Sequence, residues 1–117
     1  LVASVVLGHH ERAGSEAVAR GTRWLEAARN DDGGWGETQL GMPSDSTAEQ
    51  TAFALEAFRA MGSDDPRAAA WLCQAQAEDG SWPAAPVGIY WEVIGGYANP
   101  MNACVFPAFA LAARAEA

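Results

Sequence analysis

The sequence predicts an all-α fold in which helical hairpins stack in two layers. The first observation is a repeat: residues 20–25 and 32–35 (RGTRWL and DGGW) return as residues 67–72 and 79–82 (RAAAWL and DGSW), always 47 residues later. A period of this size is the length of one helix pair, and a single pair cannot bury its own apolar face. The second observation is that the expected helices alternate between amphipathic and nearly all apolar. Outer helices that face water and inner helices that are packed would produce this alternation.

The first three helices are expected over residues 1–8, 16–28 and 47–61. The apolar residues 1–8 are typical of the last turns of a helix, and the chain begins without methionine, which favours a fragment. The helix over 16–28 places its charged residues on one side, as an outer helix does. The helix over 47–61 follows a predicted capping box, in which Ser46 and Glu49 would satisfy two backbone amides. It has only a narrow polar strip, which predicts burial on most sides.

A fourth helix is expected over residues 66–76, because Asp65 can cap it and Pro66 suits its first helical position. A fifth helix is expected because residues 107–113 match residues 51–57 at an offset of 56 residues. Since 56 exceeds 47 by nine, the second connecting loop is expected to be nine residues longer than the first.

Pro107 lies inside the last apolar run. A proline in a helix interior lacks an N–H donor, and its ring clashes with the preceding turn. We therefore expect the last helix either to begin near Val105 or to bend at Pro107.

Composition narrows the class of function. The chain has 117 residues, of which 50% are hydrophobic and 19% charged, so it has room for one folded domain at most. It carries 7 Lys and Arg against 15 Asp and Glu, a net charge of −8, which disfavours nucleic acid as a partner. Residues 1–7 are too short to cross a bilayer, and no basic region precedes them as a signal peptide requires. A soluble cytoplasmic protein without a transmembrane segment is expected.

Cysteine and histidine positions give no sign of a metal centre. Cys73 and Cys104 have no second cysteine or histidine at metal-ligand spacing, so we expect free, buried thiols and no metal. His9 and His10 are interpreted as solvated turn residues.

The second repeat resembles the QW motif of class II terpene cyclases, the group that includes squalene-hopene cyclase. The positions of that motif are occupied by Arg67, Trp71, Gln76, Gly80 and Trp82 in the second repeat, and by Arg20, Trp24, Gly33 and Trp35 in the first. Arg29 stands where the family has glutamine. The likeness runs from about residue 20 to residue 114, because residues 51–55 (TAFAL) also resemble the inner-helix signature of the family.

The resemblance implies that the motif residues are structural. A glutamine at a helix end can bond carbonyls there or the amides that start the next helix, and an indole can shield those bonds. Arg29 can still bond carbonyls and suits the negative end of its helix. The resemblance also implies one partial α/α toroid over residues 1–117, with about five helices in inner and outer layers and repeats at about 15–61 and 62–115. Such a piece would expose apolar edges and is expected to belong to a larger cyclase.

The function implied by the resemblance is that of the C-terminal part of a class II terpene cyclase, of the isomerase or lyase type. These enzymes protonate an alkene or epoxide with an Asp-x-Asp-Asp motif and guide a carbocation through an aromatic cavity. The motif is absent here, so the chain alone is expected to be inactive on squalene or a polyprenyl diphosphate. Glu49 is a weak candidate for a substitute acid, because it precedes Thr51 and Ala52 as the family's acid motif precedes Thr-Ala. The capping role explains Glu49 by a commoner mechanism.

Six aromatic residues are candidates for a substrate cavity. Several lie in the expanded loop, and long loops at one end of a helical array commonly carry function. A desolvated aromatic face can stabilise a carbocation by about 2 kcal/mol. The alternative is that these side chains fill space between helices. The candidates are Tyr90, Trp91, Tyr97, Phe53, Phe106 and Phe109.

Cofactors and partners follow from the same resemblance. No cofactor is expected, because an Asp-Asp-x-x-Asp site is missing, and Mg²⁺ would enter only in a whole enzyme that acts on a diphosphate. The expected partners are the remainder of the cyclase chain or a second copy, together with an isoprenoid substrate. Peripheral membrane contact is left open for the whole enzyme. A non-catalytic binding or scaffold module built on the same repeat is the alternative function.

Overall fold

The computed structural model describes residues 16–36, 44–85, 87–91, 95–97 and 99–115, with the backbone alone described at 87–91 and 95–97. The elements in chain order are α2 (Glu16–Ala28), α3 (Ala48–Ala60), α4 (Pro66–Ala75), β1 (Val87–Trp91), β2 (Gly95–Tyr97) and α5 (Pro100–Ala115). The predicted all-α class is confirmed, with four helices in the described part of the chain. The helix expected over residues 1–8 lies outside the described residues.

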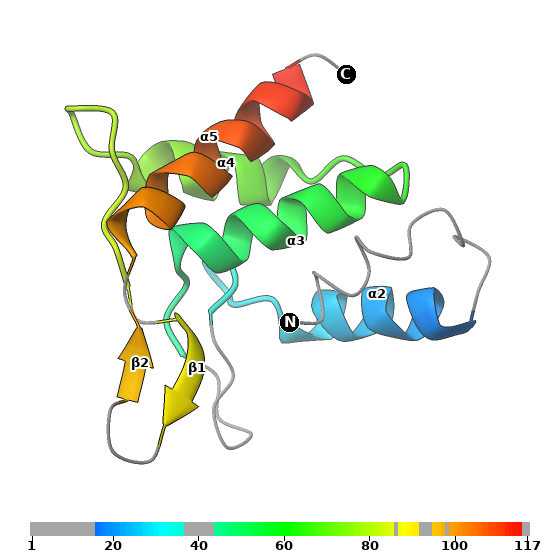
Figure 1. The fold of residues 1–117 in the computed structure, drawn as a ribbon. Coiled ribbons are helices and arrows are strands. Elements are labelled where there is room, and N and C mark those ends of the chain that lie inside the picture. Colours follow the sequence, from blue (N-terminus) through cyan, green and yellow to red (C-terminus); the bar gives the residue numbers. More distant parts are fainter. Residues whose placement is uncertain (1–15, 37–43, 86, 92–94, 98, 116–117) are drawn as a thin grey trace.

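Helix α3 is the centre of the fold. It packs most extensively against α5, then against α4 and α2 (Figure 1). Eight of its 13 residues are buried, whereas α2 buries only Val18 and Leu25. The inner position of α3 and the outer positions of α2 and α4 therefore agree with the predicted layers.

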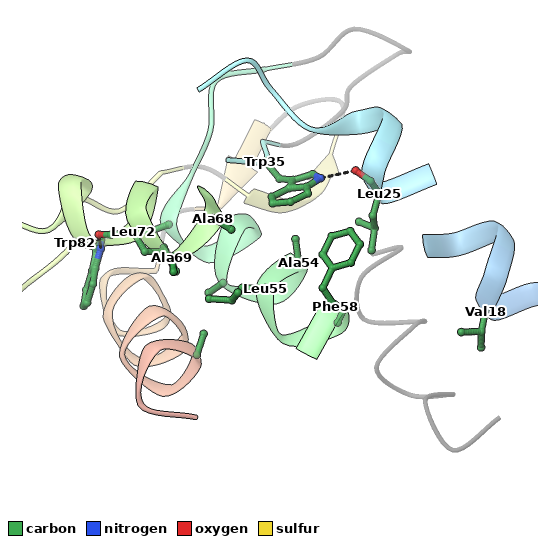
Figure 2. Close-up of a cluster of buried hydrophobic side chains, with 14 residues drawn as sticks. Val18, Leu25, Trp35, Ala54, Leu55, Phe58, Ala68, Ala69, Leu72 and Trp82 are labelled. Atoms are coloured by element: carbon green, nitrogen blue, oxygen red, sulfur yellow. Dashed lines mark hydrogen bonds between the residues drawn. The ribbon is translucent and has the colours of Figure 1, made fainter. Parts of the chain in front are cut away.

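The core is built largely from alanine and a few large side chains. Ala57, Ala68, Leu72 and Ala110 are fully buried between α3, α4 and α5. Small side chains let the helix backbones approach closely. The large residues Trp35, Phe58 and Trp82 close the cluster at the edges (Figure 2).

The start of α3 differs from the predicted capping box by one residue. Thr47 is the N-cap, and its hydroxyl oxygen accepts the N–H of Gln50 at 3.1 Å. Ser46 instead donates its hydroxyl to Asp32 Oδ1 at 2.7 Å. The prediction that Ser46 and Glu49 form the box was therefore wrong, because a tertiary contact takes the serine.

Helix α5 begins earlier than the sequence suggested. It starts at Pro100, and Asn99 Oδ1 accepts the N–H groups of Met101 and Asn102 at 3.0 and 3.1 Å. The helix continues through Pro107, whose side chain is fully buried. Of the two alternatives expected for this helix, the start near Val105 was wrong, and Pro107 instead lies inside a helix that runs from Pro100 to Ala115. An asparagine cap followed by proline at the first helical position is a signal that was present in the sequence.

A short antiparallel hairpin interrupts the helical order. Strands β1 and β2 pair Val87 with Tyr97 and Trp91 with Gly95, with an irregularity between these two pairs. The sequence predicted an expanded loop at this place and gave no strand. The hairpin directly precedes α5 and lies at one end of the inner helices α3 and α5 (Figure 1).

Candidate functional site

Two corners with the same backbone bonds follow the outer helices α2 and α4. Gly33 and Gly80 adopt φ values of 95° and 89°, which favour glycine. Each donates its N–H to the carbonyl three residues earlier, at 3.0 Å in the first corner and 2.9 Å in the second. An aspartate precedes each glycine, and its carboxylate accepts the N–H of the residue that follows the glycine. The distances are 2.9 Å from Gly34 to Asp32 and 3.0 Å from Ser81 to Asp79. The repeat in the sequence is therefore a repeat in conformation.

The corner tryptophans close the ends of these helices. Trp35 donates its indole N–H to the carbonyl of Leu25 at 2.8 Å (Figure 2), and Trp82 donates to the carbonyl of Leu72 at the same distance. Both carbonyls belong to the last four of their helices, which have no partner within the helix. The two indoles are 3% and 5% exposed. These side chains lie inside the framework, away from any open surface.

An inner-helix side chain holds each corner from the other side. Trp35 donates its backbone N–H to the Thr51 hydroxyl at 3.0 Å, and that hydroxyl donates to the Trp35 carbonyl at 3.3 Å. Trp82 donates its N–H to Cys104 Sγ at 3.4 Å, and the thiol donates to the Trp82 carbonyl at 3.8 Å. Thr51 and Cys104 therefore occupy equivalent places.

This equivalence corrects the predicted spacing of the inner helices. Cys104 lies 53 residues after Thr51, so the second connection is six residues longer than the first, not nine. Phe53 and Phe106 are also 53 residues apart, and they contact each other across α3 and α5. The cysteine prediction was half wrong as well, because Cys104 is partly buried but Cys73 is exposed.

Arg29 takes the place of the family's glutamine and also contacts a second helix. In the second corner Gln76 Nε2 donates to the Gly80 carbonyl at 2.8 Å, and in the first Arg29 donates to the Gly33 carbonyl at 3.3 Å. The guanidinium also lies 4.4 Å from the centre of the Trp35 ring and forms a two-bonded ion pair with Asp65. Arg29 thus joins the end of α2 to the start of α4.

Asp65 is a buried charge with several partners. It is 7% exposed, and Oδ1 accepts the N–H of Ala68 at 3.1 Å as the N-cap of α4. Burial raises the pKa of Asp65, but the hydrogen bond and the charge of Arg29, together with the hydrogen bond from the Ala68 amide, lower it by more. The pKa of Asp65 therefore lies below its ordinary value. The carboxylate is therefore held ionised by the first corner.

The inner face beside α3 carries the aromatic candidates. The rings of Phe53 and Phe106 lie 4.6 Å apart, tilted by 45°. Beside them α5 presents Met101, Val105 and Phe109, spaced four residues apart and 73%, 51% and 65% exposed. We call these three residues the apolar stripe of α5. The inner helix α5 is therefore open on one face, in contrast to α3 and in agreement with the predicted exposed edges.

The structure describes the surroundings of the remaining predicted site residues only in part. Glu49 lies in the first turn of α3 and is 8% exposed. Tyr90 and Trp91 belong to β1, and Tyr97 belongs to β2, but their side chains lie outside the described part. Among the described residues no group of three or more His, Cys, Asp or Glu side chains could hold a metal ion. No helix there is long and apolar enough to cross a membrane.

Sequence reasoning did not predict the long-range contacts of four residues that hold the site together, although it correctly predicted Asp65 as the N-cap of α4. Asp32, Thr51, Asp65 and Cys104 each bond a group more than ten residues away in the chain. For Asp32 and Asp79 the common spacing before the glycine was a usable signal. Nothing local indicates that Thr51 and Cys104 would meet the corners, because that contact depends on how the layers pack.

Gly34 provides a test of the first corner. A Cβ at Gly34 would lie 2.8 Å from Ser46 Cβ and 2.9 Å from Thr51 Oγ1, closer than side chains pack. Gly34→Ser is therefore expected to lower the free energy of unfolding by about 1 to 3 kcal/mol. The matched change Ser81→Gly at the equivalent position should cost less than about 1 kcal/mol. Urea denaturation of both variants measures the difference, and equal losses would contradict this packing.

Comparison with known proteins agrees with the framework. Residues 2–114 match the squalene-hopene cyclase C-terminal domain family. A squalene–hopene cyclase of Zymomonas mobilis is 38% identical over 78 residues, which cover 56% of this chain and 12% of the relative. A dammaradiene synthase of Dryopteris crassirhizoma is 35% identical over 92 residues, which cover 57% of this chain and 13% of the relative.

A third relative is a terpene cyclase–glycosyl transferase fusion protein of Humicola fuscoatra, 37% identical over 91 residues, which cover 65% of this chain and 7% of the relative. The chain thus spans a small part of the length of these relatives. Because the family match covers nearly all of the sequence and the repeated corners run through it, the chain belongs to the squalene-hopene cyclase C-terminal domain family.

Proposed function

We propose that this chain is the C-terminal part of a terpene cyclase that converts an isoprenoid by protonation-initiated carbocation chemistry. The observation that carries the proposal is the family match over residues 2–114, with relatives that are called squalene–hopene cyclase and dammaradiene synthase. Since the chain spans only 12% and 13% of these two relatives, the whole activity is assigned to a longer protein, of the isomerase or lyase type.

The role of this chain would be to line and support the cavity. The Phe53–Phe106 pair and the apolar stripe of α5 together present aromatic and aliphatic side chains on the inner layer. Such a surface excludes water, and an aromatic face can stabilise a passing carbocation by about 2 kcal/mol when desolvated. The repeated corners would hold this surface rigid from outside. Phe109, with 65% of its surface open, is the described aromatic best placed to meet a substrate.

The proton donor is assigned to another part of the longer protein. The sequence contains no Asp-x-Asp-Asp. Glu49 lies in the first turn of α3, where acidic residues commonly occur for structural reasons, since they interact favourably with the helix dipole. We therefore assign Glu49 to the framework, with no role in protonation. No cofactor is proposed for this chain, and Mg²⁺ would be required only with a diphosphate substrate.

The test uses the purified chain and a longer cyclase that contains it. The chain alone is expected to give no cyclic product from squalene or geranylgeranyl diphosphate, with or without Mg²⁺. The longer protein should cyclise one of them, and Phe109→Leu should change the product ratio, whereas Cys73→Ser on the outer helix should not. Turnover by the isolated chain, or none by the longer protein, would refute this assignment.

A non-catalytic lipid-binding or scaffold module is the second candidate. The apolar stripe of α5 favours it, because an open apolar face can receive a lipid as well as a reacting isoprenoid. A native reading frame with Asp-x-Asp-Asp upstream of Leu1 would support the enzyme. A short reading frame that begins near Leu1, together with binding of isoprenoid without conversion, would support the module. A cytoplasmic location is proposed in either case, and contact with the remainder of a cyclase chain is proposed for the enzyme.

A further inference from the structure

We infer that Glu56, on the inner helix α3, is an electrostatic stabiliser of the carbocation in the longer cyclase. This role rests on the proposed function and adds to it a charged group that the sequence did not single out. The observation behind it is an orphaned oxygen. Glu56 Oε1 is fully buried, and in the described part of the chain it has no hydrogen-bond partner. Buried polar atoms of native proteins nearly always have a partner, so this exception needs an explanation.

The carboxylate of Glu56 has few bonds for its degree of burial. Its side chain is 15% exposed, and its other oxygen, Oε2, accepts a hydrogen bond from Arg59 at 3.3 Å. That distance is longer than is usual for a charged pair. The Arg59 side chain is 43% exposed, so water screens its charge. A carboxylate with so little water and so few donors keeps most of its negative charge uncompensated.

Helix geometry places Glu56 on the side of α3 that faces away from the outer layer. Thr51 and Phe58 mark the outer side, because both contact Trp35 of the first corner. With about 3.6 residues per turn, Glu56 is rotated by about 140° from Thr51 and by about 160° from Phe58. Its side chain therefore leaves the helix on the inner side, where the isoprenoid of the proposed function would lie.

The aromatic pair is next to Glu56 on that side. Phe53 is three residues earlier, and side chains three residues apart are neighbours on a helix, with about 5 to 6 Å between their Cβ atoms. The Phe53 ring contacts the Phe106 ring of α5, with 4.6 Å between the ring centroids. Aromatic faces and a negative charge both favour a cation. The combination is therefore complementary to a carbocation rather than to a neutral hydrocarbon.

The rest of a longer chain cannot supply the missing donor simply by packing on this one. Because Oε1 is already fully buried, an added segment reaches it only if the side chain moves. For the same reason the substrate is not expected to touch Oε1, so the charge acts through space across a water-poor interior. A charge that is fixed in advance needs no reorganisation when the cation forms.

A charge retained for this purpose has a measurable effect on stability. Glu56→Gln relieves the burial of a poorly bonded carboxylate, whereas the exposed Arg59 loses only a weak contact. The melting temperature of the longer cyclase, followed by circular dichroism, is therefore expected to stay unchanged or to rise. A carboxylate that only supported the fold would give the opposite result, a lower melting temperature.

Steady-state kinetics and product analysis of the longer cyclase, with squalene and geranylgeranyl diphosphate as substrates, test this role. Glu56→Gln keeps the shape and removes the charge. It should lower kcat at least about tenfold with little change in KM, because the charge stabilises the cation and not the bound substrate. It should also raise the share of incompletely cyclised alkenes, which form when the carbon beside the cationic centre loses its proton to water.

Two further variants identify the charge as the cause. Glu56→Asp keeps the carboxylate and should recover most of the turnover. Glu26→Gln makes the same chemical change at an exposed position of the outer helix α2. It is the matched control and should leave rate and products as in the unmodified cyclase.

The outcomes separate this role from the proposed function. A longer cyclase that forms no cyclic product would refute the proposed function and this role with it. If the unmodified enzyme cyclises its substrate and Glu56→Gln keeps the same rate and products, only the role of Glu56 is overturned. A lower melting temperature of Glu56→Gln, or a Glu56→Asp variant as slow as Glu56→Gln, would also overturn it, since the loss would then come from packing and not from charge.

Discussion

Replacing Trp35 with alanine is expected to lower the free energy of unfolding by about 3 to 5 kcal/mol. The indole is 3% exposed, packs 5.8 Å from the Phe58 ring and lies under the Arg29 guanidinium. Truncation removes this buried area and leaves a cavity. It also leaves the Leu25 carbonyl without its donor at the end of α2. Urea denaturation followed by circular dichroism measures the loss.

Two further variants keep this test informative even where Trp35→Ala fails to fold. Trp35→Phe retains most of the ring but loses the bond to Leu25, so it should lose about 1 to 3 kcal/mol. Trp24→Ala, on the outer surface of α2 and 46% exposed, should change the stability of the monomer by less than about 1 kcal/mol. Similar losses at positions 24 and 35 would show that the corner indole is not packed framework.

Removing Arg29 is expected to be as damaging, at about 3 to 5 kcal/mol, because it strands a buried charge. Arg29→Ala removes both bonds to Asp65, which is 7% exposed. Arg29→Gln, which installs the residue of the second corner, restores the reach to the Gly33 carbonyl but leaves Asp65 without its cation. Adding Asp65→Asn to Arg29→Gln should therefore recover stability, because asparagine is still an N-cap and carries no charge. Chemical denaturation of the single and double variants completes the cycle.

Acidification checks the same pair independently. The pKa of Asp65 is lowered in the folded protein, so its contribution to stability is present above the unfolded pKa of about 3.9 and is lost as pH falls through the folded value. The destabilisation caused by Arg29→Ala should therefore shrink between about pH 5 and pH 2. A difference between the two proteins that is constant over this range would contradict an ionised Asp65 held by Arg29.

Local chemistry explains why the outer helices were predictable. Helix α2 has the predicted bounds of 16–28, and α4 begins at Pro66 as predicted. Breaking signals, an acidic cap and proline at the first position act within one turn of the chain. The start of α3 was misplaced by one residue because Ser46 bonds Asp32, 14 residues away. Rules based on neighbouring residues could not predict that Ser46 would bond Asp32 instead of capping the helix.

In the candidate site, too, the local features could be predicted from the sequence and the long-range contacts could not. The repeated spacing indicated that Trp35 and Trp82 close equivalent corners, and the same spacing identifies Trp24 as the counterpart of Trp71. It could not show that Thr51 and Cys104 hold those corners or that Arg29 pairs with Asp65. These contacts join residues 16 to 36 positions apart.

By itself the sequence determined the helical class, the period of 47 residues and the corner at the end of each outer helix, because these depend on neighbours within a turn or two of the chain. The tertiary structure alone decided which acidic group meets Arg29, where the last helix starts and which face of it stays open. Those outcomes depend on packing between layers, where burial and the need to satisfy every polar group select among partners that are distant along the chain.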